Sequence, residues 1–375
     1  MKNEVNINSN MLTWAITRAG YELNVFIEDF PQVHKWLVGD KKPTVKQLEA
    51  FSKKVHIPFG YLFLNEPPKE ILPIPFFRTN KTLAKKVSLN VYDTILLIQQ
   101  RQDWLRDYLK DNESEPLPFV SKFANRNNIQ EIVADIRKTL NLPENWASNF
   151  KTWQEAQDHL VIHIEAKGIV TVFNGVVENN SHRTIPVDDC RGFVLVDEMA
   201  PFMFINNSDY KSAQMFTIAH ELAHIWTGHS AGFDFRELQP ANDPVEVLCD
   251  KVAAEFLVPE KTINTVWAKK TDFKFLSKYF KVSEIVIARR ALDLGKITKK
   301  EFFAFYAEYA KREFTNKENQ AGGGMFYTTA RKRISRIFAT HINNAVTSGK
   351  LLYRDAYKLT GLKGDTFQIF FAEYM

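Results

Sequence analysis

Two histidines and a glutamate stand at the spacing of a metal site in the stretch Phe216 to His229, which reads F-T-I-A-H-E-L-A-H-I-W-T-G-H. His220 and His224 are four residues apart, so on an α-helix they lie on one face, one turn from each other. Two imidazoles placed in this way can bind one metal ion. Glu221 follows the first histidine and would lie beside the open position of the ion, where it can take a proton from water. The alternative is a core helix whose two histidines are satisfied by hydrogen bonds.

The residues around this motif predict the helix that must carry it. Apolar side chains at helical spacing give the helix buried faces. Asn207, Ser208 or Asp209 can cap its start, and Gly228 can end it. The apolar positions are Phe216, Ala219, Leu222, Ala223 and Trp226.

A catalytic zinc ion needs a third protein ligand, and a second predicted helix offers one. Asp243 is a typical N-cap residue, and Pro244 suits the first helical position. Glu246 then falls in the first turn, far enough after His224 for a loop and a returning helix. Glu246 would complete a His, His, Glu ligand set and leave a fourth position for water. Asp250, one turn later on the same face, can accept the N–H of a ligand histidine and fix its orientation.

Glu246 fits a second role, because it stands three residues after Asp243 and could close a capping box with it. The ligand and the cap need different rotamers of the Glu246 side chain. Other residues near the motif could supply the third ligand in its place. These are Asp234, Glu237, Glu255 and His229.

A peptide-cleaving site would also need a hydrogen-bond donor for the developing oxyanion besides the metal. His229, Tyr210 and His182 are candidates, and the sequence leaves the three open. His229 lies five residues after His224, so a capping role at the end of the helix suits it at least as well.

Two of these segments resemble the ImmA/IrrE family of zinc metallopeptidases: H-E-L-A-H-I-W-T-G-H, and E-V-L-C-D-K-V-A-A-E-F-L-V-P from Glu246 to Pro259. The resemblance extends upstream to Ile164–Phe173 and Arg191–Asn206, which resemble motifs of the subgroup with a helix-turn-helix-like domain before the peptidase. Glu246 and Asp250 together also resemble the helix pattern of the gluzincins. The subgroup commonly has Asn at the position of Asp250, but both residues can accept a hydrogen bond from imidazole.

The resemblance implies a cytoplasmic zinc endopeptidase that cuts a helix-turn-helix repressor or an antitoxin protein to switch on transcription. One Zn²⁺ per chain would be bound by His220, His224 and Glu246, with Glu221 as the general base and Asp250 behind a ligand histidine. Two other classes stay open. One is a DNA-binding regulator that uses the peptidase fold as a sensor, and the other is a component of a toxin–antitoxin or phage-defence pair. The intact motif favours the enzyme, because a sensor has no need of the base.

The patterns along the chain predict an α+β fold that is mostly helical. The expected parts are a five-helix domain over 1–66, a linker and connecting helix over 67–120, a gluzincin-like metallopeptidase core over 121–260 and a helical C-terminal region over 261–375. The prolines after Pro67 predict an extended strap, and the glycines within 316–324 predict a flexible break.

Three short runs before the histidine motif are rich in β-branched and aromatic residues and predict strands. They are Ile169–Phe173, Gly192–Val196 and Phe202–Ile205, with a hairpin or a loop at the substrate edge expected from Gly175 to Val187. A small sheet is therefore expected to precede the helix of the metal site.

The segment Trp36 to Phe51 resembles the repressor-type helix-turn-helix domain of the Xre class. Its fold does not by itself predict DNA binding. The helix in the recognition position, Pro31–Val38, offers only His34 and Lys35, and residues 1–80 contain 10 basic and 8 acidic side chains. Because a DNA reader usually has a stronger positive charge, docking of a protein partner is the expected role.

The net charge of +5 is spread unevenly along the 375 residues. From Lys261 to the end there are 22 Lys and Arg against 10 Asp and Glu, with a cluster at Arg331, Lys332, Arg333 and Arg336. Such a stretch is usually a solvated helical face, and its functional alternative is contact with nucleic acid or an acidic partner.

The remaining composition argues against a membrane protein and against a disulfide framework. No run of about 18 apolar residues predicts a membrane span, and the first residues have no apolar signal core. Cys190 and Cys249 are the only cysteines, which fits a reducing cytoplasm, and Cys249 is expected to be a small buried apolar residue.

Overall fold

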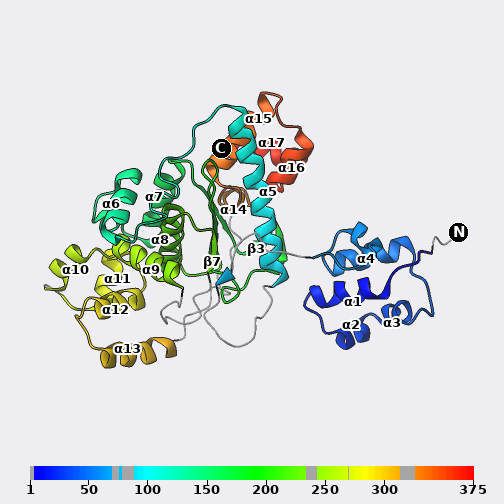
Figure 1. Cartoon of the computed structure of the whole chain (residues 1–375), viewed down its shortest axis with the longest axis horizontal. Coiled ribbons are helices and arrows are strands. Elements are labelled where there is room, and N and C mark those ends of the chain that lie inside the picture. The colour runs from blue at the N-terminus through cyan, green and yellow to red at the C-terminus, as the bar shows by residue number, and fades with distance from the viewer. Residues whose placement is uncertain (1–3, 70–75, 78–87, 234–242, 269, 313–325) are drawn as a thin grey trace. The chain divides into compact units, whose positions relative to one another are not determined.

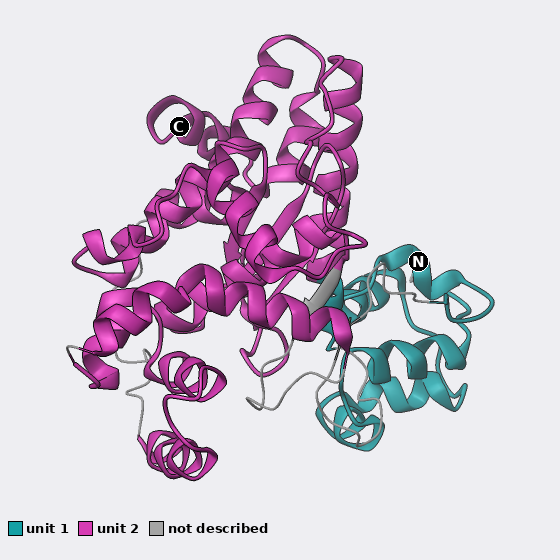
Figure 2. Ribbon diagram, turned by 60° about the vertical axis from the view of Figure 1, so that its left-hand side comes forward, with its two compact units in different colours: residues 1–73, 86–93 teal, residues 74–85, 94–375 magenta. Residues whose placement is uncertain are grey.

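A computed structural model of the chain describes residues 4–69, 76–77, 88–233, 243–268, 270–312 and 326–375. Most of the predicted strap after Pro67 and all of the predicted break at 316–324 lie outside the described residues. The chain divides into two compact units, one of residues 1–73 with 86–93 and the other of residues 74–85 with 94–375 (Figure 2). Each unit is considered by itself below.

The N-terminal unit is a cluster of short helices around one apolar core. Thr44 starts one of them with a capping box, in which its hydroxyl accepts from the Gln47 amide and the Gln47 side chain accepts from the Thr44 amide. The fifth predicted helix of this unit is a 3₁₀ helix. The elements are α1 (Ser9–Arg18), α2 (Leu23–Asp29), α3 (Pro31–Leu37), α4 (Val45–Lys54) and η1 (Phe59–Phe63).

The larger unit is built on a mixed sheet with the strand order β1-β7-β5-β6-β2. The three predicted strands are confirmed to within one residue at each end. The predicted hairpin is also present, as an antiparallel pair with an irregular register. The sheet strands are β1 (Phe76–Phe77), β2 (Val170–Asn174), β5 (Gly192–Leu195), β6 (Phe202–Asn206) and β7 (Ala231–Phe233), and the hairpin strands are β3 (Val176–Val177) and β4 (Asn180–Thr184).

Helices cover both faces of this sheet (Figure 1). One layer contains α7 and α8 against the sheet, with α6 and α9 beyond them, and its buried apolar side chains form the main core. The other layer contains α5, α14 and α15, where Gln102 of α5 donates to the Leu195 and Ala200 carbonyls at the β5–β6 turn. The helices are α5 (Leu89–Asp111), α6 (Ile129–Leu140), α7 (Trp153–Glu165), α8 (Lys211–Thr227), α9 (Pro244–Leu257), α14 (Phe326–Ile334) and α15 (Arg336–Thr347), with a 3₁₀ turn η2 (Trp146–Asn149).

Helices that follow α9 pack beside this core, and the last two end the chain. Ser283 and Thr298 cap two of them through their hydroxyls, as expected for a hydroxyl residue before an apolar helical run. The α+β, mostly helical fold predicted from the sequence is confirmed. None of the helices in the described ranges is long and apolar enough to cross a membrane. The remaining helices are α10 (Glu260–Trp267), α11 (Phe273–Phe280), α12 (Glu284–Asp293), α13 (Lys299–Lys311), α16 (Tyr353–Thr360) and α17 (Gly364–Glu373).

Candidate metal centre

The histidine motif lies in the second half of α8, and nearly every side chain of that half is buried. The helix ends as predicted, because Gly228 adopts the left-handed conformation with φ 78° and donates its N–H to the His224 carbonyl. Its predicted cap is wrong: Tyr210 is the N-cap residue and provides no side-chain bond. Asp209 is used differently, because its Oδ2 pairs with Arg191, the residue just before β5.

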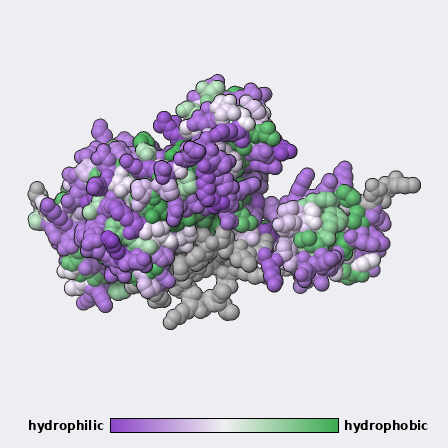
Figure 3. All heavy atoms as spheres, turned by 45° about the horizontal axis from the view of Figure 1, so that its top comes forward, coloured by the Kyte–Doolittle hydropathy of each residue, from purple (hydrophilic) through white to green (hydrophobic). Residues whose placement is uncertain are grey.

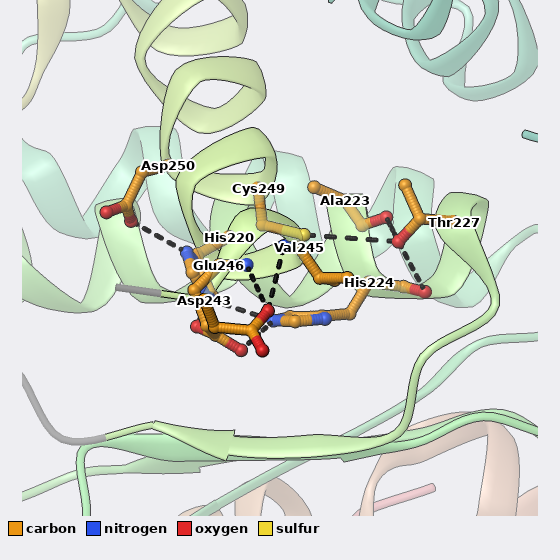
Figure 4. Close-up of polar contacts among 9 residues, drawn as sticks. All are labelled: His220, Ala223, His224, Thr227, Asp243, Val245, Glu246, Cys249 and Asp250. Atoms are coloured by element: carbon orange, nitrogen blue, oxygen red, sulfur yellow. Dashed lines mark hydrogen bonds and ion pairs between the residues drawn. The ribbon is translucent and has the colours of Figure 1, made fainter. Parts of the chain in front are cut away.

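The third candidate ligand enters from α9, which packs against α8. Asp243 caps α9 as predicted, accepting from the amides of Val245 and Glu246. The capping box is not formed, and the Glu246 carboxylate contacts the histidines (Figure 4). Glu246 is only 1% exposed, as fits a side chain committed to an internal site.

Three ligand atoms converge between the two helices (Figure 4). His220 Nε2 lies 3.0 Å from His224 Nε2 and 3.2 Å from Glu246 Oε2, and Glu246 Oε1 lies 3.3 Å from His224 Nε2. Each of the three residues can offer one ligand atom within 4.8 Å of the others. The structure therefore brings together the three residues predicted to bind a metal.

Asp250 lies behind the first histidine, one turn after Glu246 on α9. Its Oδ1 is 3.0 Å from His220 Nδ1, so the imidazole can donate its Nδ1–H to the carboxylate. That bond leaves His220 Nε2 as the nitrogen that faces His224 and Glu246, which is the orientation a metal ligand needs. His224 Nδ1 is buried and has no hydrogen-bond partner among the described residues, so the two histidines are held differently.

Glu221 lies toward β5 of the sheet and is close enough to His220 and Glu246 for their charges to affect its pKa. It is completely buried, and neither carboxylate oxygen has a hydrogen-bond partner among the described residues. A Cβ added at Gly192 would lie 3.4 Å from Glu221 Oε1, 2.5 Å from Thr217 Cγ2 and 2.9 Å from the Phe204 carbonyl oxygen. The absence of a side chain at Gly192 thus lets β5 approach α8 closely beside the carboxylate.

The charges of the site depend on burial and on these contacts. Burial alone would lower the pKa of His220, but its hydrogen bonds with Asp250 and Glu246 raise that pKa to about 10. Burial opposes ionisation of Glu246, yet its contacts with the two imidazoles lower its pKa to about 2. Burial raises the pKa of Glu221 to about 8. A positive charge between α8 and α9 therefore stabilises the ionised form of Glu246.

These residues fit a divalent cation. Two Nε2 atoms face each other, and a single proton between them can complete only one hydrogen bond. Glu246 Oε1 and both oxygens of Glu221 are buried without a hydrogen bond in the described part of the chain, which is costly for carboxylates unless a cation is near. Two imidazole nitrogens and one carboxylate form a ligand set that zinc commonly takes in hydrolases.

The other candidates lie elsewhere or outside the described residues. Glu255 pairs with Arg290, away from the histidines, and both side chains are buried. His229 is exposed just after α8, and it lowers the pKa of His224 less than burial and His220 do. Tyr210 is 38% exposed at the start of α8, and His182 is exposed on β4. Asp234 and Glu237 lie outside the described residues.

Comparison with known protein families agrees with this geometry. Residues 164–292 match the model of the IrrE N-terminal-like domain, a peptidase family, from the last turn of α7 to the end of α12. The match supports the ImmA/IrrE family. The five predicted site residues all lie within the matched range. They are His220, Glu221, His224, Glu246 and Asp250. Residues 334–373 match a domain of unknown function, DUF8813, and no curated protein and no solved structure matches the chain.

The ImmA/IrrE match supports a metallopeptidase and bears on the central part of the chain alone. Gly192 and Tyr210 belong to the same segment. The sequence analysis predicted neither the close approach of Gly192 to α8 nor the N-cap position of Tyr210. Gly192 had a signal, because an isolated glycine in a strand often marks close approach of another element. Tyr210 had none, since a tyrosine is not a typical cap residue.

Proposed function

We propose that the chain is a zinc-dependent endopeptidase whose active site is formed by His220, Glu221, His224 and Glu246. The observation that carries the proposal is the convergence of two imidazole nitrogens and a buried carboxylate at 3.0–3.3 Å, with a second buried carboxylate, Glu221, near enough for the charges of His220 and Glu246 to affect its pKa. Zinc bound by these side chains would polarise the scissile carbonyl and lower the pKa of a water molecule.

The protein residues have separate tasks in this reaction. His220, His224 and Glu246 bind the ion, and Asp250 orients His220 by accepting its Nδ1–H. Glu221 takes a proton from the attacking water at one carboxylate oxygen and gives it to the departing amide nitrogen. Its oxygens are suited to this task because no hydrogen bond within the described chain occupies them.

The substrate we propose is a folded helix-turn-helix repressor or antitoxin, as the family resemblance implies. The N-terminal unit would dock this protein. Val25 on α2 and Val38 after α3 are 51% and 54% exposed, and Figure 3 shows hydrophobic atoms gathered on the visible face of that unit. Glu28 and Asp29 at the end of α2 would repel phosphates, which favours a protein partner over DNA.

The test is cleavage of purified helix-turn-helix repressor and antitoxin proteins, measured by mass spectrometry of the fragments. We expect one cut that requires zinc and is lost in Glu221→Gln. Cleavage at the same rate by a Glu221→Gln preparation would remove the proposal. Docking is tested separately: Val25→Glu with Val38→Glu should slow cleavage of the folded protein and leave cleavage of a short peptide spanning the cut unchanged.

The competing function is a DNA-binding regulator in which the peptidase fold acts as a sensor. A sensor could use the same metal ligands, but it would gain nothing from a buried carboxylate at the position of Glu221. Full transcriptional control by the Glu221→Gln chain, with the partner protein left uncut, would favour this alternative.

A further inference from the structure

The C-terminal helices carry the densest positive charge of the chain. From Phe326 to Lys363 the sequence contains 8 Lys and Arg and a single acidic residue, Asp355. This stretch forms α14, α15 and α16, which lie far along the chain from the metal centre. The peptidase reaction does not use this charge, and a polyanion is the class of ligand that such a surface could bind.

The last two helices form a helix-turn-helix. Only Gly361, Leu362 and Lys363 separate α16 from α17, and Gly361 has the left-handed conformation with φ 71° that a tight turn needs. Phe367 of α17 is buried and packs against α16, with ring centroids 5.2 Å from Tyr357. Leu359, Leu362 and Phe370 complete a small apolar core around the turn.

Contacts at both ends place α14 beside α17. Tyr327 at the start of α14 stacks on Tyr374 after the end of α17, with ring centroids 4.4 Å apart. At the other end, Arg333 donates to the Asn179 side chain, and Asn179 Nδ2 donates to the Gly361 carbonyl at 2.9 Å. The last turn of α14 therefore lies near the turn that precedes α17, and the two helices run in opposite directions.

Several of the cations on this surface are not neutralised by the protein. Lys332 pairs with Asp158, and Arg354 and Lys358 share Asp355. Arg331, Arg336 and Lys363 are exposed and have no ion pair within the described residues. Lys363 is also the N-cap of α17, and its side chain does not cap the helix. Free cations beside the start of a helix are suited to phosphate oxygens.

We propose that α14 and the α16–α17 helix-turn-helix form a binding site for double-stranded DNA. Arg331, Arg336 and Lys363 would contact backbone phosphates, and α17 would lie toward a groove, as the second helix of this motif does. Gln368, exposed on α17, is the side chain available to a base edge. Asp365 and Glu373 on the same helix limit its own charge, so the phosphate contacts supply most of the affinity.

DNA is favoured over an acidic protein because the charge lies on the helices around a short-turn helix-turn-helix. The site is distinct from the metal centre, and none of its residues takes part in the proposed cleavage. It also differs from the N-terminal unit, whose charge is nearly balanced.

The experiment is fluorescence anisotropy of the full chain with a labelled duplex of about 30 base pairs, measured across a series of salt concentrations. The test variant is Arg331→Ala with Arg336→Ala and Lys363→Ala. The matched control is Lys299→Ala with Lys300→Ala and Lys311→Ala, which removes equal charge from α13. Helix content by circular dichroism and peptidase activity verify that each variant is folded.

We expect the wild-type chain to bind the duplex at moderate salt and the test variant to bind about tenfold or more weakly. The slope of log affinity against log salt should fall by about 2 to 3, because each lost phosphate contact removes close to one unit. The control should stay within about twofold of wild type. Conservative Arg331→Lys with Arg336→Lys should keep the salt slope.

Three results would overturn the proposal. One is no binding of the duplex by the folded wild-type chain. Another is an equal loss in the α13 control, which would mean that overall charge alone attracts DNA. The third is equal binding of poly-glutamate that is lost in the same test variant, which would assign the surface to an acidic protein.

Discussion

α8 carries two neighbouring buried side chains, His220 and Glu221, whose hydrogen bonding differs. On the side of α9, His220 makes hydrogen bonds with Asp250 and with Glu246. On the side of β5, Glu221 is equally buried, yet neither oxygen is hydrogen bonded within the described residues. The first arrangement holds side chains in one orientation, as ligands require. The second leaves a carboxylate available for proton transfer, as a general base requires.

This difference separates binding from catalysis in a way that substitutions can test. Changes on the α9 side should act through metal affinity, and activity should fall because the ion is lost. Changes on the β5 side should leave the ion in place and act on turnover alone. An equal loss of metal from substitutions on the α9 side and on the β5 side would contradict this separation.

The largest effect is expected from His224→Ala, which removes a ligand nitrogen from the buried site. We expect wild type to bind about one zinc per chain and this variant to lose both the metal and the activity, as His220→Ala should too. Metal analysis after gel filtration measures the stoichiometry. Full zinc occupancy in His224→Ala would contradict the role of this face of α8.

Glu246→Gln should weaken zinc binding by orders of magnitude while helix content stays normal, because a neutral amide is a poor zinc ligand. Gln also serves in capping boxes, so this variant is conservative if the side chain only supports the helix. Titration with a competing chelator gives the affinity, and circular dichroism gives the helix content. Zinc bound as tightly as in wild type would exclude Glu246 and direct attention to Asp234 or Glu237.

Asp250→Ala should lower metal affinity or activity by about 10- to 100-fold, since it frees His220 Nδ1 without removing a ligand. Asp250→Asn is the matched control, because its side-chain oxygen can still accept the imidazole N–H. We expect the Asn variant to recover most of the loss in the same chelator titration. An Asn variant as weak as the Ala variant would show that charge, and not orientation, is what Asp250 supplies.

Gly192→Ala should give the smallest effect, on stability first. The added methyl would lie 2.9 Å from the Phe204 carbonyl oxygen and 2.5 Å from Thr217 Cγ2, so β5 or α8 must shift. Overpacking of this kind typically costs about 1–3 kcal/mol of unfolding free energy. Thermal unfolding measures it, with activity of the folded fraction as a second reading. An unchanged melting temperature would mean that the sheet and α8 are less tightly apposed.

The sequence could indicate the candidate metal residues because most of their relations are local. His220, Glu221 and His224 share one helix, and Asp243 and Pro244 fix where α9 begins, which places Glu246 and Asp250 on one face. The contact of Glu246 with the histidines is a tertiary contact. It could be expected because a zinc site needs a third ligand, and residue spacing alone does not predict it.

Features that depend on tertiary packing are not visible in the pattern. Asp209 is a typical helix-capping residue, but its carboxylate pairs with Arg191 and does not cap α8. The strands β1 and β7 have two and three residues, too few for an alternation of apolar and polar side chains. α15 lies in the region predicted to be helical, but its Thr and Asn residues favour helices weakly, so burial of Phe338 and Ile342 is what stabilises it.

The most direct test of the account is a paired measurement on Glu221→Gln: zinc per chain and the rate of cleavage of the partner protein. We predict about one zinc per chain, as in wild type, and a rate lowered by about 10² or more, the usual scale for loss of a general base. Wild-type cleavage by this variant, or loss of its zinc, would contradict the assignment of Glu221 as a base that does not bind the metal.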